Sequence, residues 1–174
     1  MDIHKYEKGW LVASLVLIVF FISTVAYVSA ITGVDMVDDS GGTIDPDEVN
    51  DDDRFGEPRV EQVGENEYEV YMRAIQFVFL PNTVEVPEDS TVTFYITSSD
   101  VVHGYQIVGT NVNTMVIPGQ ISEITVEFDE PGEHGVICNE YCGSGHQDME
   151  AMVIVHPEDE WEEMQSGGDE GGDS

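Results

Sequence analysis

The sequence predicts an all-β sandwich domain that follows a single membrane-spanning helix. Three observations support this architecture: an uncharged apolar segment near the N-terminus, a series of short strands between turn residues, and a length that fits one domain with extensions. We expect five parts in order: an N-terminus at 1–10, a helix at 11–33, an acidic linker at 34–66, a β domain at 67–157 and an acidic disordered tail at 158–174.

The predicted helix carries no charged residue from Gly9 to Val34, and its apolar stretch matches the about 20 residues that cross a bilayer. Lys5 and Lys8 precede it, which favours a cytoplasmic N-terminus and a β domain on the outer side of the cell membrane. The alternative is a cleaved secretory signal, but the apolar core exceeds the about 7 to 15 residues typical of one. We therefore expect a retained single-pass anchor.

The β domain is predicted from short runs rich in β-branched and aromatic residues. Two runs alternate cleanly and so have one buried face: Val92, Phe94 and Ile96 in the first, and Ile124, Val126 and Phe128 in the second. The expected strands are 68–75, 84–87, 91–97, 105–108, 114–117, 123–128, 134–137 and 151–155. Their spacing is typical of a sandwich or a barrel.

The charge balance is strongly acidic, with 36 Asp and Glu against 5 Lys and Arg. Such a chain repels nucleic acid, so no nucleic-acid partner is expected. It also repels itself in dilute buffer, whereas at about 1 M salt the Debye length is only about 3 Å. The simplest interpretation is a salt-loving source organism. The acidic segments 35–53 and 158–174 are expected to be disordered.

One interstrand loop concentrates candidate metal ligands. It contains both cysteines of the chain, Cys138 and Cys142, together with His146 and Met149. Two intervening glycines favour a wrapped loop that turns several side chains inward. Thiolate, imidazole and thioether donors together suit copper better than magnesium, calcium or manganese, and zinc sites rarely use methionine. A small disulfide or a zinc site is the alternative.

A mononuclear blue-copper site uses one thiolate with two histidines, which leaves one cysteine over. Two thiolates can instead bridge two copper ions, and this arrangement requires a second histidine. The best candidate is His103, in a turn between two strand runs. His4, His134 and His156 are poorer candidates, because the first lies before the helix and the others lie on or beyond strands.

With His103 upstream, the pattern from Cys138 to Met149 resembles the binuclear CuA copper loop of cytochrome c oxidase subunit II. The resemblance covers residues 6–155 and is greatest to the B-type branch, whose subunit II has one membrane span. It implies a cupredoxin-like Greek-key sandwich. The ligands that it implies are His103, Cys138, the Glu140 carbonyl, Cys142, His146 and Met149. Because the side chain at the Glu140 position binds magnesium in some branches, magnesium at the subunit interface stays open.

The resemblance also implies the function. A terminal oxidase subunit II accepts electrons from an external carrier, cytochrome c or a small blue-copper protein, and passes them to heme in subunit I. Two other interpretations stay open: a membrane-anchored copper electron carrier, or a copper-delivery or zinc-binding protein, each without an oxidase partner. Phe77 and Phe79 are equally consistent with core packing and with donor docking. Glu7 resembles an acid at the mouth of a proton path, or is a solvated helix-end charge.

Overall fold

The computed structural model describes residues 4–32 and 41–167 of the chain, and it divides into two compact units, residues 1–34 and 35–174. The first unit holds helix α1, Lys5–Thr32. Within the described residues it is the one helix long and apolar enough to cross a membrane, and the candidate span runs over the 23 residues from Lys5 to Tyr27. The predicted apolar helix is therefore present, with its start shifted to Lys5.

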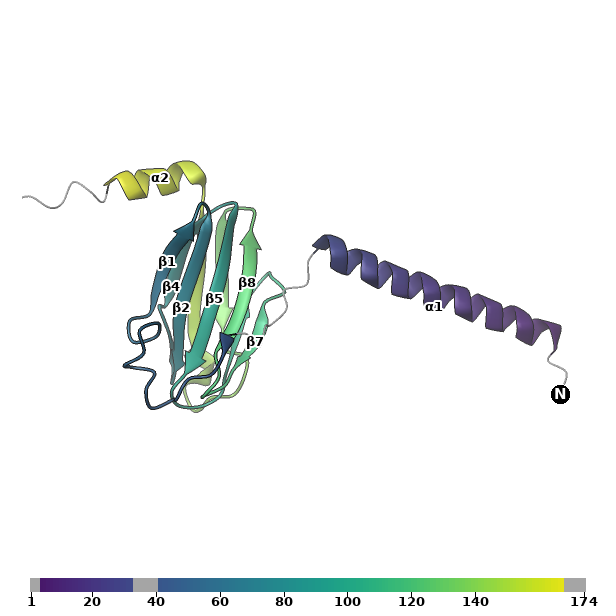
Figure 1. Ribbon diagram of the computed structural model, residues 1–174, viewed down its shortest axis with the longest axis horizontal. Helices are drawn as coiled ribbons and strands as arrows, with labels where there is room; N and C mark the ends of the chain where they lie inside the picture. The colour runs from purple at the N-terminus through teal and green to yellow at the C-terminus, as the bar shows by residue number, and fades with distance from the viewer. Residues whose placement is uncertain (1–3, 33–40, 168–174) are drawn as a thin grey trace, which may run out of the picture. The chain divides into compact units, whose positions relative to one another are not determined.

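The second unit is a β-sandwich of two sheets (Figure 1). The first sheet has the order β1-β2-β5-β8, and β3 also pairs with β2. β2 and β5 run parallel, whereas β5 and β8 run antiparallel. The strands of this sheet are β1 (Arg59–Gly64), β2 (Glu67–Ile75), β3 (Val78–Leu80), β5 (Ser90–Ser98) and β8 (Ser122–Phe128).

The second sheet has the order β4-β10-β9-β6-β7. β4 pairs in parallel with β10, and the remaining pairs are antiparallel. Its strands are β4 (Thr83–Pro87), β6 (His103–Ile107), β7 (Asn113–Val116), β9 (Gly132–Ile137) and β10 (Glu150–His156). Each of the eight predicted strands is confirmed to within two residues at either end; β1 and β3 were missed.

The core lies between the two sheets, where the alternation in the sequence places it. Val92, Phe94 and Ile96 are fully buried, and the matching residues of β8 are at most 4% exposed. Tyr105 of β6 meets them from the other sheet, and its ring packs against Phe94 and Phe79. Burial of these large side chains is the main force that closes the sandwich.

The prediction of disorder in the acidic segment 35–53 is wrong for its described part, 41–53. Val49 and Phe55 are fully buried in a small second core with Ile121. Phe55 also contacts the ring of Tyr71, which stacks on Tyr95 on the outer face of the first sheet. The outward tyrosines thus give the acidic segment an apolar surface to cover, and β1 follows it as an edge strand.

The prediction of a disordered tail is also wrong for residues 158–167, which form helix α2, Glu158–Gly167. Its first turn holds three acidic residues, which the positive end of the helix dipole favours. Trp161 fixes the helix to the sandwich by packing on Tyr68 at the start of β2 and on His156 at the end of β10. Residues 168–174 lie outside the described part.

The candidate metal loop lies at the other end of the sandwich from α2. β2 begins at Glu67, next to Tyr68 beside α2, and over nine residues reaches Ile75. At about 3.3 Å per residue this spans roughly 30 Å. The β2–β3 turn, the β5–β6 connection and the β9–β10 loop all occur at that far end.

Candidate metal centre

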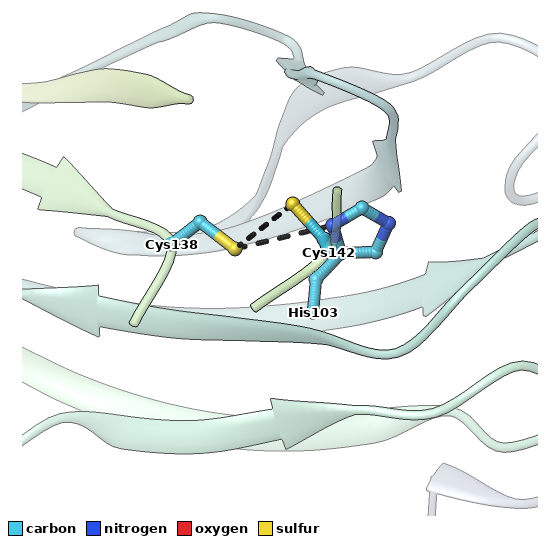
Figure 2. Close-up of side chains that lie close together, drawn as sticks. All are labelled: His103, Cys138 and Cys142. Atoms are coloured by element: carbon cyan, nitrogen blue, oxygen red, sulfur yellow. Dashed lines mark hydrogen bonds between the residues drawn. The ribbon is translucent and has the colours of Figure 1, made fainter. Parts of the chain in front are cut away.

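Two buried thiols form the middle of the candidate metal centre. The Sγ atoms of Cys138 and Cys142 lie 3.8 Å apart, and the residues are only 6% and 4% exposed (Figure 2). A disulfide has sulfurs about 2.05 Å apart, so the structure contains two free thiols. The separation leaves both sulfurs free to bind the same metal ions.

His103 completes a cluster with the two thiols. It is the first residue of β6 and is fully buried. Its Nδ1 lies 3.9 Å from the Sγ of Cys138, and the ligand atoms of His103, Cys138 and Cys142 all lie within 4.8 Å of one another (Figure 2). The sheet thus presents to the loop the histidine selected from the sequence, although 35 residues separate it from Cys138.

The other three predicted residues surround the same pair of sulfurs. The backbone oxygen of Glu140 lies 3.2 Å from the Sγ of Cys138. On the other side, the Nδ1 of His146 and the Sδ of Met149 each lie 3.7 Å from the Sγ of Cys142. Each sulfur therefore has one imidazole and one further donor beside it. The structure brings all six predicted residues together; their role as ligands stays a prediction.

The loop folds back because its two ends are hydrogen-bonded. The backbone N–H of Cys138 donates to the carbonyl of Met149 over 3.1 Å, where β9 and β10 meet. Between them Gly143 has a φ of +137°, a conformation that side-chain-bearing residues rarely adopt. A short 3-10 helix, η2 (His146–Asp148), then turns the chain toward Met149. The loop is wrapped, as the glycines predicted.

A carboxylate outside the sulfur cluster orients His103. The Oδ1 of Asp100 lies 2.8 Å from the Nε2 of His103, so Nδ1 is the nitrogen that faces the thiols. Burial alone would raise the pKa of Asp100, but hydrogen bonds, first from His103 and then from backbone N–H groups, outweigh it and lower the pKa below its usual value. Asp100 is thus held as an anion.

The pKa of Cys142 is shifted in the opposite direction. Burial raises it to about 11, and the neighbouring Cys138 adds to the shift. Without a metal, Cys142 is therefore a neutral thiol at neutral pH. A soft cation that binds here as a thiolate complex must displace this proton, and its charge then replaces the solvation that the buried thiolate lacks.

The histidines judged poorer candidates contact other groups. His156 pairs with Glu85 at 2.9 Å and stacks on Trp161 at the α2 end. The ring of His134 lies 5.5 Å from that of Phe128. His4 belongs to the other unit, where its ring contacts Tyr6. None of these three belongs to the sulfur cluster of the described residues.

Three residues that support the site were not selected from the sequence. Asp100 had a detectable signal, because a metal-binding histidine often donates its other ring N–H to a carboxylate, and Asp100 lies three residues before His103. Asn139 donates from Nδ2 to the Oδ1 of Asn113 over 2.8 Å and so ties the loop to β7. Gln76 donates from its side chain to the Cys142 carbonyl. These last two contacts join distant segments, and no spacing in the sequence marks them.

The two phenylalanines left open in the sequence have different surroundings. Phe79 is fully buried in the core. Phe77 lies in the β2–β3 turn, and its ring covers the glycines of the metal loop. A Cβ atom added at Gly145 would lie 2.5 Å from the Cδ2 of Phe77, and one at Gly143 would lie 2.9 Å from its Cε1. The glycines therefore permit this close approach.

The donor set fits a pair of copper ions. Two thiols, two imidazoles and one thioether are soft to borderline donors, joined by one harder backbone carbonyl, and two thiolates exceed the need of a single blue-copper ion. A closed zinc site would use four strong ligands and leave the thioether of Met149 without a role. The fold and the site together define a class of protein: a β-sandwich that holds a soft-metal centre in its end loops, preceded by an apolar helix.

Comparison with known proteins identifies the family. Residues 63–156 match the family described as cytochrome C oxidase subunit II, periplasmic domain. The chain is 41% identical over 166 residues to cytochrome c oxidase subunit 2 of Thermus thermophilus, an alignment that covers 89% of this chain and 98% of that protein. A second Thermus thermophilus sequence of the same name is 43% identical over 64% of this chain and 84% of its own length.

A solved structure agrees with the sequence matches. One chain of a heme-copper terminal oxidase dimer superposes with a TM-score of 0.68 and 32% identity, and the match covers 87% of this chain and all of that one. The chain belongs to the cytochrome c oxidase subunit II family. This confirms the family predicted from the sequence and the cupredoxin-like fold that came with it.

Proposed function

We propose that this chain carries a binuclear copper centre of the CuA type and is the electron-accepting subunit of its oxidase. Family membership makes it a subunit of cytochrome c oxidase, a heme-copper oxidoreductase complex. The observation that carries the copper proposal is the symmetric placement of donors: two free thiols 3.8 Å apart, each beside one imidazole nitrogen. When bound, the copper pair would take one electron from an external carrier and deliver it to heme in subunit I.

The protein residues keep the ligands in place while the charge of the centre changes. Asp100 holds His103 from one side, and the Cys138 to Met149 backbone bond holds the loop ends from the other. Burial of both cysteines excludes water from the sulfurs. A rigid, dry ligand shell needs little rearrangement when an electron arrives, which favours fast transfer.

Docking of the donor and of subunit I is proposed to rely on apolar contacts near the loop. Tyr141 of the loop is 74% exposed, Ile137 at the end of β9 is 41% exposed, and Met115 on β7 is 51% exposed. The formal net charge of −31 indicates a chain that works in high salt, where long-range steering is screened. The donor class stays cytochrome c or a small blue-copper protein, and a salt-loving source is part of this proposal.

The finer family features are also proposals. The apolar helix α1, the one candidate span among the described residues, supports membrane anchoring and the B-type branch. Lys5 and Lys8 before its apolar part favour a cytoplasmic N-terminus with the sandwich outside. The Glu140 side chain is exposed while its carbonyl faces Cys138, so it is available for magnesium at a subunit interface.

The test is to load the full chain with copper in detergent and molar salt, and to measure metal content and the electron paramagnetic resonance spectrum. Two copper ions per chain with a seven-line hyperfine pattern are expected. One copper with a four-line pattern would instead favour the anchored single-copper carrier, and zinc alone would favour a delivery or storage role. Co-purification with a heme protein separates an oxidase subunit from both alternatives.

A further inference from the structure

The β2–β3 turn contacts both halves of the candidate metal centre through one residue, Gln76. Its backbone N–H donates to the Oδ2 of Asp100 over 2.7 Å. Its side-chain amide donates from Nε2 to the backbone carbonyl of Cys142, 66 residues along the chain. Gln76 itself is exposed, whereas Cys142 is only 4% exposed.

These two bonds complete a chain of contacts across the site. The Oδ2 of Asp100 accepts the hydrogen bond from the Gln76 backbone N–H. Its Oδ1 lies 2.8 Å from the Nε2 of His103. The sequence of contacts is therefore His103, Asp100, Gln76, Cys142. It joins the strand that supplies the first histidine to the loop that supplies both thiols, and it does so from outside the sulfur cluster.

The hydrogen bond from Gln76 to Cys142 is needed because the other hydrogen bonds of the loop fix residues other than Cys142. The Cys138 to Met149 bond fixes the two ends of the loop, and Asn139 fixes its start to β7. Cys142 lies between those ends, four residues after Cys138. It is next to Gly143 with its positive φ, and glycine adds backbone freedom there. Among the described contacts, the Gln76 amide is the one that reaches the Cys142 carbonyl from another segment.

We propose that Gln76 is a positioning residue that sets the place of the Cys142 thiol relative to His103. It touches neither sulfur, and it acts through the Cys142 backbone and through Asp100. The inference rests on the proposed copper function for its consequence, but the positioning itself is a property of the metal-free chain. It is therefore tested first without metal.

The first experiment measures how fast iodoacetamide alkylates the cysteines of the metal-free full chain, at fixed pH and in molar salt. Gln76→Ala and Gln76→Leu remove the donor; the second keeps most of the side-chain volume. Loss of one hydrogen bond is expected to raise the alkylation rate of Cys142 about threefold to tenfold in both variants. The matched control is Gln62→Ala, on exposed strand β1, which should leave the rate unchanged.

Unchanged alkylation in both Gln76 variants would overturn the proposal. A faster rate in Gln76→Ala but not in Gln76→Leu would overturn it too, because bulk rather than the hydrogen bond would then matter. Circular dichroism of each variant checks that the sandwich is intact. This is expected, since Gln76 is exposed and contributes nothing to the core.

The second experiment adds copper. Both Gln76 variants are expected to bind two copper ions with altered hyperfine splitting, whereas Gln62→Ala should match the unsubstituted chain. Failure of the unsubstituted chain to bind a copper pair would contradict the proposed function. The alkylation result alone would then decide whether Gln76 positions Cys142. Hyperfine splittings in both variants identical to those of the unsubstituted chain would overturn positioning even with a normal copper pair.

Discussion

The Nε2 of His103 lies 2.8 Å from the Oδ1 of Asp100, and this contact turns Nδ1 toward the thiol of Cys138. Asp100→Ala removes the carboxylate that fixes this orientation. We expect copper affinity to fall about 10-fold to 100-fold, the usual effect of losing a group that orients a metal ligand. Competition with a copper chelator measures the change. Asp129→Ala, in the exposed connection that follows β8, is the control, and an equal loss of copper affinity there would show a general charge effect.

Gly145→Ala is expected to destabilise the metal-free chain. The added Cβ would lie 2.5 Å from the Cδ2 of Phe77, so the ring must move away from the loop. Such overpacking costs about 1–3 kcal/mol in the free energy of unfolding, measurable by urea denaturation.

Two further variants check the cause. Gly132→Ala should change little, because its new Cβ meets only His134, at 4.0 Å. In a chain that already carries Phe77→Ala, Gly145→Ala should lose most of its effect. A full effect in that background would assign the cost to the backbone instead.

Loss of copper is expected to lower the melting temperature. The six donors come from the loop and from β6, so they lie together only in the folded chain, and copper binding therefore favours folding. At a free copper concentration of 100 times the dissociation constant, the gain is about 2.7 kcal/mol. Calorimetry of loaded and chelated samples measures it. Cys142→Ser should show a much smaller gain, and equal gains in both chains would mean that copper binds elsewhere.

Alkaline pH is expected to weaken the fold through Tyr71. Burial, and then the hydrogen bond to Glu69, raise the pKa of Tyr71 from 10.0 to about 12. Below pH 10 both the folded and the unfolded chain hold this proton. Between pH 10 and about 12 only the folded chain does, so the free energy of unfolding falls as pH rises through that interval.

Urea denaturation at several pH values tests this slope. Tyr71→Phe should lose less stability than the unsubstituted chain above pH 10, because it has no proton to retain there. Tyr6→Phe, outside the sandwich, should behave like the unsubstituted chain. Parallel curves for Tyr71→Phe and the unsubstituted chain would contradict the expectation.

Trp161→Ala is expected to release α2 from the sandwich. The indole packs on Tyr68 and His156 but stays partly exposed, so its loss should cost about 1–2 kcal/mol, less than the about 3–5 kcal/mol of a fully buried aromatic. Protease cleavage within residues 158–167 should also become faster. Met164→Ala, exposed on the same helix, is the control, and equal effects of both changes would argue against the Trp161 contact.

Local pattern was sufficient where one segment decides the outcome. The period-two alternation of β5 and β8 located both buried faces. A strand with one solvent-exposed face must alternate apolar and polar side chains. The uncharged apolar run located α1, because about 20 consecutive apolar residues are sufficient to predict a membrane-spanning helix. The ligand types of the loop at Cys138 and Cys142 indicated a soft metal, since donor chemistry belongs to the residues themselves.

Acidic composition gave the wrong answer twice, for the same reason. Val49 and Phe55 in the expected linker, and Trp161 in the expected tail, are few apolar residues among many charges. Whether so few apolar residues can order a segment depends on the surface against which they pack. Here Phe55 packs near Tyr71 and Tyr95, and Trp161 packs against Tyr68 and His156.

The sequence by itself therefore determined the apolar helix, the sandwich, the soft donor set and the family. Only the tertiary structure decided which histidine nitrogen faces the sulfurs, and that Gln76 and Asp100 link the two halves of the site. The physical reason is distance along the chain. A hydrogen bond between residues 66 positions apart depends on how strands pair and where turns end, and no local pattern of side chains records that.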